Sequence, residues 1–365
     1  NLSYLQTDWY IDQMKRPAYD SPSVPITWPR IDYCSGTNEL VEIHPYVKQD
    51  IMEYYKQNPE QARAQFGDDP FDVKNIMKYW VRSKDKDMRI IPTDTVYVKI
   101  DKEAVRKSGM LMAGDSIPDK MVISLAGKRG LGKESLMMLE MIAQCNWTRP
   151  LYIATTVAEK YYMNLGDNFV QEGLAYRITP FTTKNPGMKN IDTEKMYNNL
   201  MNRYKWGGLE KPGLYLDETV MRMCYTHRHL FAILALALVE ENKKDKAVEV
   251  LDKCQKVIPD YNVPVTFMSA GADMAQAYAL AGQKAKAAKL LDAVWKNAEQ
   301  YAVWYLSLNG SRFTQAQNDF LRQVVMLKST AEQTALVDAK LAEKRMQRLN
   351  ALYATYISKG GVELK

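Results

Sequence analysis

A glycine-rich segment carries the pattern in this sequence that comes closest to a known chemical motif. It runs from Gly127 to Glu134, follows a predicted strand and opens a predicted helix, so it fits the G-x-x-x-x-G-K part of a phosphate-binding loop. Glu134 stands where a Ser or Thr hydroxyl would hold Mg²⁺, and a carboxylate there repels phosphate. We therefore interpret the segment as a turn, with Glu134 favourably placed near a helix N-terminus, and expect no cofactor.

The histidines and cysteines do not form the pattern of a metal or nucleophile site. His227 and His229 lie two residues apart, so on a helix they point to different sides, and His44 is the one other histidine. A catalytic zinc needs three protein ligands, and no Ser-His-Asp or Cys-His arrangement can be singled out. The four cysteines contain no CxxC pair. We expect neither a metal nor a catalytic residue in this chain.

Acidic and aromatic side chains near the start of the chain are the remaining candidates for binding. Asp8 and Asp12 lie four residues apart and share one face of a helix if Thr7 is its N-cap. Two acids near a helix start are equally explained by the helix dipole. Trp9 and Tyr10 could form a platform for a sugar ring, or they could belong to the core, and the sequence leaves both alternatives open.

The elements that must position these residues alternate between strand and helix up to about residue 181. Short runs rich in β-branched or aromatic residues predict strands at 2–5, 95–100, 121–125, 151–155 and 174–178. Helical patterns lie at 7–15, 47–56, 72–83, 102–108 and 133–145. This alternation predicts an α/β region with a mostly parallel sheet. The proline-rich stretch 16–46 is predicted to be an extended surface loop, pinned to the domain by its tyrosines and Trp28.

Two helical units in the second half of the chain repeat at a spacing of 40 residues. In each unit one alanine lies on a first helix and another follows the turn: Ala235 and Ala247, then Ala275 and Ala287. Small residues at these places let the two helices of a hairpin approach closely. The pattern resembles the tetratricopeptide repeat, whose usual length is about 34 residues. About three repeats are needed for a continuous core, so the flanking helical segments are expected to act as caps.

Length and composition are those of an ordinary globular protein. Of its 365 residues, 46% are hydrophobic and 25% are charged, as is usual for globular proteins. This length exceeds the size at which a single hydrophobic core stops growing. We predict an α/β domain over residues 1–190 and an all-α tetratricopeptide-like repeat domain over residues 191–365, with a cluster of proline and glycine at 180–187 between them.

Charge and hydropathy exclude two further classes of function. The net charge of +6 is spread along the chain without a basic stripe, so we expect no nucleic-acid partner. The longest apolar run, residues 230–239, is about half of the roughly 20 residues that cross a bilayer. The chain is therefore expected to be soluble.

Four long segments carry a family resemblance. They are NLSYLQTDWYIDQMKR from residue 1, LGKESLMMLEMIAQCNWTRPLYIATTV from residue 131, GDNFVQEGLAYRITPF from residue 166 and YLDETVMRMCYTHRHLFAILALALVEENKKDKAVEVLDKCQKVIPD from residue 215. Together they resemble the C-terminal region of Bacteroidetes multispanning membrane proteins that contain a domain of unknown function. That family is similar to eukaryotic protein O-mannosyltransferase-like transmembrane proteins, which also end in tetratricopeptide repeats.

The resemblance implies an N-terminal membrane domain, outside this chain, that binds a lipid-linked sugar and transfers it to an acceptor. It implies that the catalytic acidic residue belongs to that membrane domain, and no residue of this sequence matches its motif. The chain would then lie on the periplasmic side of the inner membrane as a non-catalytic domain. Its expected partners are its own membrane domain and acceptor proteins or peptides, with membrane contact only through the missing part.

Two functions follow from this resemblance. In the first, stacked helical hairpins form a concave surface that binds acceptor protein or holds the complex together. In the second, the α/β half contributes sugar- or lipid-phosphate-binding residues to a composite transferase active site, with Asp8, Trp9, Tyr10 and Arg149 as candidates. A freestanding nucleotide-dependent enzyme is disfavoured by Glu134.

Overall fold

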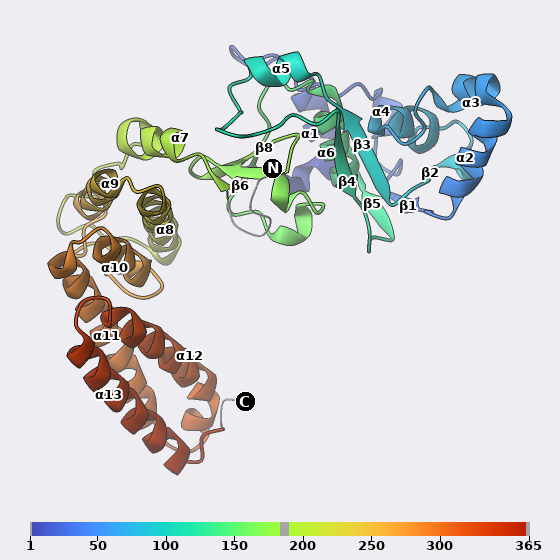
Figure 1. The fold of residues 1–365 in the computed structure, drawn as a ribbon. Helices are drawn as coiled ribbons and strands as arrows, with labels where there is room; N and C mark the ends of the chain where they lie inside the picture. The colour runs from blue at the N-terminus through green and yellow to red at the C-terminus, as the bar shows by residue number, and fades with distance from the viewer. Residues whose placement is uncertain (1, 183–189, 363–365) are drawn as a thin grey trace. The chain divides into compact units, whose positions relative to one another are not determined.

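The computed structural model describes residues 2–182 and 190–362, which fold into two compact units (Figure 1). Unit 1 comprises residues 1–171 and 175–190, and unit 2 comprises residues 172–174 and 191–365. Most of the cluster of proline and glycine predicted at 180–187 lies outside the described residues. In the described part of the chain, no helix combines the length and apolar character needed to cross a bilayer.

Unit 1 combines short helices and short strands with long connections. Its helices are η1 (Leu2–Gln6), α1 (Asp8–Met14), η2 (Arg30–Asp32), α2 (Val47–Gln57), α3 (Pro59–Phe66), α4 (Val73–Asn75), η3 (Ile76–Val81), η4 (Lys86–Met88), α5 (Lys102–Lys107), α6 (Lys133–Gln144), η5 (Glu159–Tyr161) and η6 (Gly166–Asn168). Its strands are β1 (Leu40–Ile43), β2 (Ile90–Ile91), β3 (Thr95–Lys99), β4 (Lys120–Ser124), β5 (Gly130–Gly132), β6 (Tyr152–Ala154), β7 (Phe169–Gln171) and β8 (Ala175–Ile178). The two-residue strand β9 (Asn190–Ile191) stands where the chain passes into unit 2.

The strands form three small sheets, with the orders β2-β1-β5, β3-β4 and β6-β8-β7-β9. Among the pairings whose register is described, β1 and β2 run parallel and the other four are antiparallel. The expectation of a mostly parallel sheet is therefore wrong. Alternation of strand and helix along the chain does not determine strand direction, and three residues join β7 to β8, which is too short for a parallel crossover.

Most elements predicted for unit 1 are present, and one has the wrong type. The strands predicted from residue 95 onward correspond to β3, β4, β6 and β8, and the predicted helices correspond to α1, α2, α4 with η3, α5 and α6. The strand predicted at 2–5 is instead the 3₁₀ helix η1. Leu2 and Leu5 lie three residues apart, which places both on one side of a 3₁₀ helix, and Leu5 is buried in the core.

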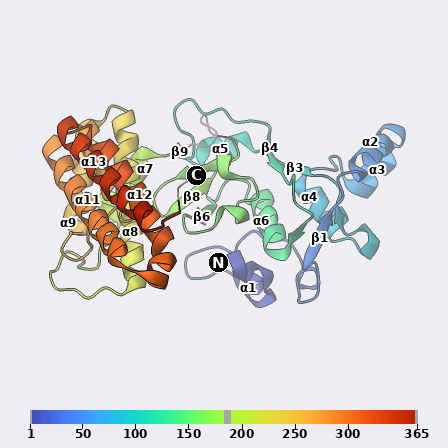
Figure 2. The same cartoon turned by 90° about the horizontal axis from the view of Figure 1, so that it is seen from below.

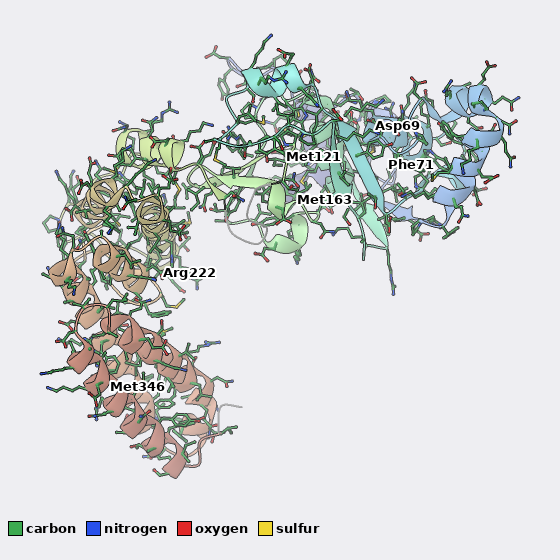
Figure 3. The ribbon with its side chains drawn as sticks, viewed as in Figure 1. Asp69, Phe71, Met121, Met163, Arg222 and Met346 are labelled. Carbon is green, nitrogen blue, oxygen red and sulfur yellow. The ribbon has the colours of Figure 1, made fainter. Side chains whose placement is uncertain are left out.

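The core of unit 1 also holds part of the proline-rich loop. Met121 and Met163, labelled in Figure 3, are buried in the same cluster as Trp28 and Tyr33. The Lys15 ammonium donates a hydrogen bond of 2.5 Å to the carbonyl oxygen of Trp28. The predicted pinning of the loop is thus confirmed for Trp28 and Tyr33, whereas Tyr19 is fully exposed.

In the described part of the chain, the regular secondary structure of unit 2 is helical apart from its share of β9. Its helices are α7 (Thr193–Asn198), η7 (Asn199–Arg203), α8 (Glu218–Glu240), α9 (Lys244–Val257), α10 (Gly271–Leu280), α11 (Lys284–Ser307), α12 (Gly310–Thr334) and α13 (Ala339–Ser358). They pack as the hairpins α8–α9, α10–α11 and α12–α13, and the hairpins stack in chain order (Figures 1 and 2).

The turns of the first two hairpins are equivalent at a spacing of 40 residues. Asn242 and Gly282 both have positive φ, 60° and 86°. In each turn the next N–H donates to a carbonyl five residues earlier, at 2.7 Å for Lys243 and 2.8 Å for Gln283. This is the hydrogen-bond pattern of a Schellman helix end. The alanines that were predicted to lie between the paired helices are all fully buried: Ala235, Ala247, Ala275 and Ala287.

Candidate functional site

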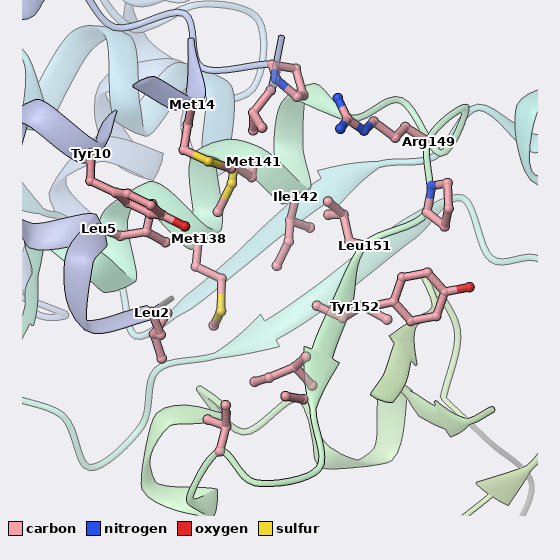
Figure 4. Close-up of a pocket in the computed structure, with 17 residues that line it drawn as sticks. Leu2, Leu5, Tyr10, Met14, Met138, Met141, Ile142, Arg149, Leu151 and Tyr152 are labelled. Carbon is pink, nitrogen blue, oxygen red and sulfur yellow. The ribbon is translucent and has the colours of Figure 1, made fainter. Parts of the chain in front are cut away.

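An open cavity of about 420 Å³ in unit 1, called the unit 1 cavity below, is lined by two of the residues predicted to bind (Figure 4). Its volume falls within the roughly 300–1,000 Å³ of ligand pockets. The walls come from η1, α1, the loop that follows α1, α6, the segment that joins α6 to β6, and β6 itself, with Val157 and Ile178 of β8 completing the lining. All lining residues are aliphatic, methionine or proline except Tyr10, Tyr152 and Arg149.

The spacing of apolar residues on α1 and α6 explains how the two helices build this wall. Tyr10 and Met14 lie four residues apart on α1, and Met138, Met141 and Ile142 follow the i, i+3, i+4 pattern on α6. Residues at these spacings share one helix face. Each helix therefore presents an apolar stripe to the cavity, and Figure 4 shows these side chains grouped together.

Arg149 is the one charged residue among the described residues that line the cavity. Its Nη1 donates hydrogen bonds to the carbonyl oxygens of Pro22, at 2.9 Å, and Ser23, at 3.1 Å. Both carbonyls belong to the proline-rich loop, so the contact holds the loop against the segment that follows α6. Within the described ranges no carboxylate forms a salt bridge with Arg149. Its positive charge is therefore not neutralised by a neighbouring side chain.

Asp8 and Asp12 lie outside the cavity and are paired with a cation. The Arg30 guanidinium donates to an oxygen of Asp8 at 2.9 Å and to an oxygen of Asp12 at 2.5 Å. This shared contact confirms that the two acids lie on one face of α1. Tyr33 also donates its hydroxyl to Asp12, at 2.7 Å, and burial, with Asp12 beside it, raises the pKa of Tyr33 to about 12. Both acids thus have structural partners.

Trp9 is half exposed and does not line the unit 1 cavity. Its ring centre lies 5.6 Å from the rings of both Tyr4 and Tyr10, in tilted and edge-on geometries. Tyr10 thus connects an exposed aromatic group to the cavity wall. Of the four predicted binding residues, the structure brings Tyr10 and Arg149 to one cavity and places Asp8 and Trp9 elsewhere.

A buried carboxylate anchors the loop that forms one wall of the cavity. Glu140 on α6 is almost fully buried, and one of its oxygens accepts hydrogen bonds from Thr27, at 2.9 Å from the amide and 2.6 Å from the hydroxyl. The bonds tie the loop to α6, which places Val24 and Pro25 at the cavity. Glu140 was not predicted from the sequence. Its position inside the apolar run of residues 136–143 was the available signal.

The glycine-rich segment does not form a phosphate-binding loop. Gly130–Gly132 form β5, which pairs antiparallel with β1. Lys133 is buried, and its ammonium donates to an oxygen of Glu39 at 2.8 Å and to the Cys34 carbonyl at 3.3 Å. The hydrogen bond from Lys133 lowers the pKa of the Glu39 carboxyl. A lysine held in this way is not available to a bound phosphate.

The two histidines on α8 hydrogen-bond to backbone carbonyls, and a buried arginine lies between them. His227 contacts the Met223 carbonyl at 2.7 Å, and His229 contacts the Met268 carbonyl at 3.2 Å. Arg228 was not predicted to matter, yet it is almost fully buried. Across the described residues, no three His, Cys, Asp or Glu side chains are grouped so as to hold a metal ion.

Comparison with known proteins identifies a relationship for the half of the chain that holds the cavity. The family model described as TMEM260-associated domain 2 matches residues 1–195. No curated protein matches the chain, and no solved structure does.

Proposed function

The chain belongs to the TMEM260-associated domain 2 family, and on this premise we propose that it is a non-catalytic part of a glycosyltransferase-like membrane protein. It acts on the extracytoplasmic face, which is the periplasm if the parent is a Bacteroidetes protein, as the sequence resemblance implies. Unit 2 binds acceptor proteins or holds the complex together. Its partners are the membrane domain of the same protein and acceptor proteins or peptides.

The pair of equivalent hairpins in unit 2 carries this proposal. Their turns at Asn242 and Gly282 share one hydrogen-bond pattern, and a third hairpin, α12–α13, stacks on them. We assign them to the tetratricopeptide-like class, in which stacked hairpins create extended surfaces that bind peptides or proteins.

Exposed aromatic side chains near the end of α11 support a binding role. Tyr301 is 49% exposed and Trp304 is 54% exposed, and both contact the ring of Tyr305. Tyrosine and tryptophan are enriched at protein interfaces and at their energetic hot spots. This aromatic group is therefore the first surface to test.

The test compares the periplasmic glycopeptides of cells that carry the full-length protein with those of cells that carry variants. We expect deletion of residues 191–365, and the double substitution Tyr301→Ala with Trp304→Ala, to reduce glycosylation of acceptors. Tyr215→Ala is the matched control, since this tyrosine is 92% exposed in the same unit. Unchanged glycopeptides after the deletion would exclude acceptor recognition by unit 2.

A second candidate function places sugar- or lipid-phosphate binding in unit 1, as part of a composite active site. It is favoured by the meeting of Tyr10 and Arg149 at one cavity, although they come from distant parts of the sequence. Asp8, which is paired with Arg30, and Trp9 have no place in this version of the site. If alanine at Tyr10 and at Arg149 left transfer by the full-length protein unchanged, this candidate would fail.

A further inference from the structure

The lining of the unit 1 cavity is suited to a flexible hydrocarbon chain. Three methionines, Met14, Met138 and Met141, contribute to it, and the rest of the wall is almost entirely aliphatic or proline. Methionine side chains are unbranched and soft, so they adapt to apolar groups of irregular shape. A hydrocarbon chain leaves no polar group without a partner in such a cavity.

A peptide fits this lining less well than a hydrocarbon chain does. A peptide buries amide N–H and carbonyl groups, each of which needs a hydrogen-bond partner. The described side chains that line the cavity offer hydrogen-bonding groups at Tyr10, Tyr152 and Arg149. The composition of the wall therefore favours a lipid over a peptide.

Arg149 supplies a cation at one end of this apolar lining. Figure 4 shows Arg149 at one end of the group of lining residues, and Leu2 toward the other. The hydrogen bonds of Arg149 within the described part use Nη1, which leaves Nε and Nη2 as donors. A guanidinium with free donors and no carboxylate partner binds an anionic oxygen by charge-assisted hydrogen bonds.

The charges around the cavity also orient the ligand. An adjoining hollow shares Leu2, Ala154 and Val157 with the cavity and is lined by Glu134. A carboxylate on the Leu2 side repels an anionic group, and the Arg149 side attracts one. From these observations we propose that the unit 1 cavity binds the hydrocarbon chain of an anionic lipid whose charged group lies at Arg149. The proposal rests on the second candidate function for its site and names the ligand class.

The test measures binding of three probes to the 365-residue chain by isothermal titration calorimetry, below micelle-forming concentrations. Dodecyl phosphate has both a hydrocarbon chain and an anionic group. Dodecanol has the chain alone, and inorganic phosphate has the anionic group alone. We expect dodecyl phosphate to bind more tightly than dodecanol, and inorganic phosphate to show no saturable binding. Arg149→Gln is expected to weaken dodecyl phosphate about tenfold and to leave dodecanol unchanged.

Further variants distinguish binding in the cavity from a general effect of positive charge. Ala154→Phe places a ring in the cavity from an exposed strand position and is expected to abolish binding of both dodecyl compounds. Met141→Phe on α6, which also lines the cavity, serves if that variant does not fold, as judged by circular dichroism. Arg106→Gln is the matched control, because this exposed arginine of the same unit pairs with Glu103. It is expected to bind all probes as the unaltered chain does.

Three results would overturn the proposal. If dodecyl phosphate and dodecanol bound equally, the anionic group would contribute nothing to binding. If inorganic phosphate bound as tightly as dodecyl phosphate, the ligand would be a free anion and not a lipid. If the dodecyl compounds still bound to both Ala154→Phe and Met141→Phe, the binding site would lie outside the unit 1 cavity. The assay contains no acceptor and no transfer step, so its failure is distinct from failure of acceptor recognition by unit 2.

Discussion

Arg228 is a buried cation, and the oxygens that accept its hydrogen bonds in the described part of the chain are all neutral. Its guanidinium donates to the carbonyl oxygens of Ile258 at 2.9 Å, Val263 at 2.6 Å and Pro264 at 3.1 Å, and to the Ser269 hydroxyl at 3.0 Å. Desolvation by burial lowers the pKa of Arg228. The contacts fasten the connection between α9 and α10 to α8, and so set the spacing of the first two hairpins.

Replacing Arg228 by methionine removes the donors of all four hydrogen bonds while keeping an unbranched apolar stem. We expect the free energy of unfolding to fall by about 3 kcal/mol or more, because each buried acceptor left unpaired costs about 1–3 kcal/mol. Urea denaturation followed by circular dichroism measures the change. Arg222→Met on the same helix is the control, since Arg222 is exposed (Figure 3) and pairs with exposed Glu218. Its expected change is within about 0.5 kcal/mol.

The ion pair between Lys133 and Glu39 makes the stability of unit 1 depend on pH. The hydrogen bond from Lys133 lowers the pKa of Glu39 below its ordinary value of 4.5. A carboxyl whose pKa is lower in the folded state stabilises the fold above its unfolded-state pKa, and this contribution is lost as the pH falls through the folded-state pKa. Glu39 must therefore stabilise the chain at neutral pH and not in acid.

Glu39→Gln is expected to lower the free energy of unfolding by about 1 kcal/mol at neutral pH. The difference from the unaltered chain should shrink as the pH falls from 4.5 through the lower folded-state pKa, because below that pKa Glu39 is protonated in both states. Denaturation curves at neutral and acid pH measure it. A difference that stays constant over this range would show that the charge of Glu39 contributes nothing. Glu103→Gln, in an exposed pair with Arg106, is the control.

At the scale of elements, the turns that follow α8 and α10 in unit 2 have the same left-handed backbone conformation but different residues. Asn242 and Gly282 both adopt a left-handed conformation, at φ of 60° and 86°. Glycine does so without steric cost, and asparagine tolerates it better than most residues. Apart from Gly282 itself and its two chain neighbours, no described heavy atom lies within 4 Å of a Cβ added at Gly282. A substitution there therefore tests the backbone conformation alone.

Gly282→Ala is expected to destabilise unit 2 by about 1–2 kcal/mol, the cost of a left-handed conformation for a residue with a Cβ. Asn242→Gly at the equivalent turn is expected to be neutral within about 0.5 kcal/mol, because glycine accepts that conformation. Thermal denaturation of the two variants compares them directly. Equal destabilisation by both would show that the turns are not equivalent in energy.

At the scale of the whole molecule, the chain holds separate hydrophobic cores. One large cluster of buried side chains and a smaller one around Phe66 and Trp80 lie in unit 1, and two others, around Phe231 and around Phe320, lie in unit 2. A unit with its own core can open without the other. The proposed lipid site belongs to the first unit, and the proposed acceptor surface belongs to the second.

Peptide-level hydrogen exchange distinguishes the units. We expect Arg228→Met to speed amide exchange in α8–α11, and Glu39→Gln to speed exchange in β1, β5 and the start of α6, each without effect on the other unit. The physical reason is that exchange reports local opening, whose free energy is set by the contacts of the element that opens. Exchange that rises across both units in either variant would show that they unfold together.

Local patterns predicted much of the secondary structure of this protein. Apolar periodicity indicated the strands β3 and β4 and the helices of the first two hairpins, and the 40-residue spacing indicated that these hairpins have equivalent turns, because such features depend on residues close together in the chain. The short strands β1 and β5 were not predicted, because three or four residues carry too little periodicity to be distinguished from a loop.

The sequence by itself therefore determined the helical second half, its repeat spacing and the division between strand-rich and helical regions. Only the tertiary structure decided the direction of the strands, the helical form of residues 2–6 and the burial of Lys133, Glu140 and Arg228. It also decided that Tyr10 and Arg149 line one cavity while Asp8 pairs with Arg30. These outcomes depend on contacts between segments that lie far apart in the sequence. Such contacts cannot be predicted from the polarity of a single residue or from its immediate neighbours in the chain.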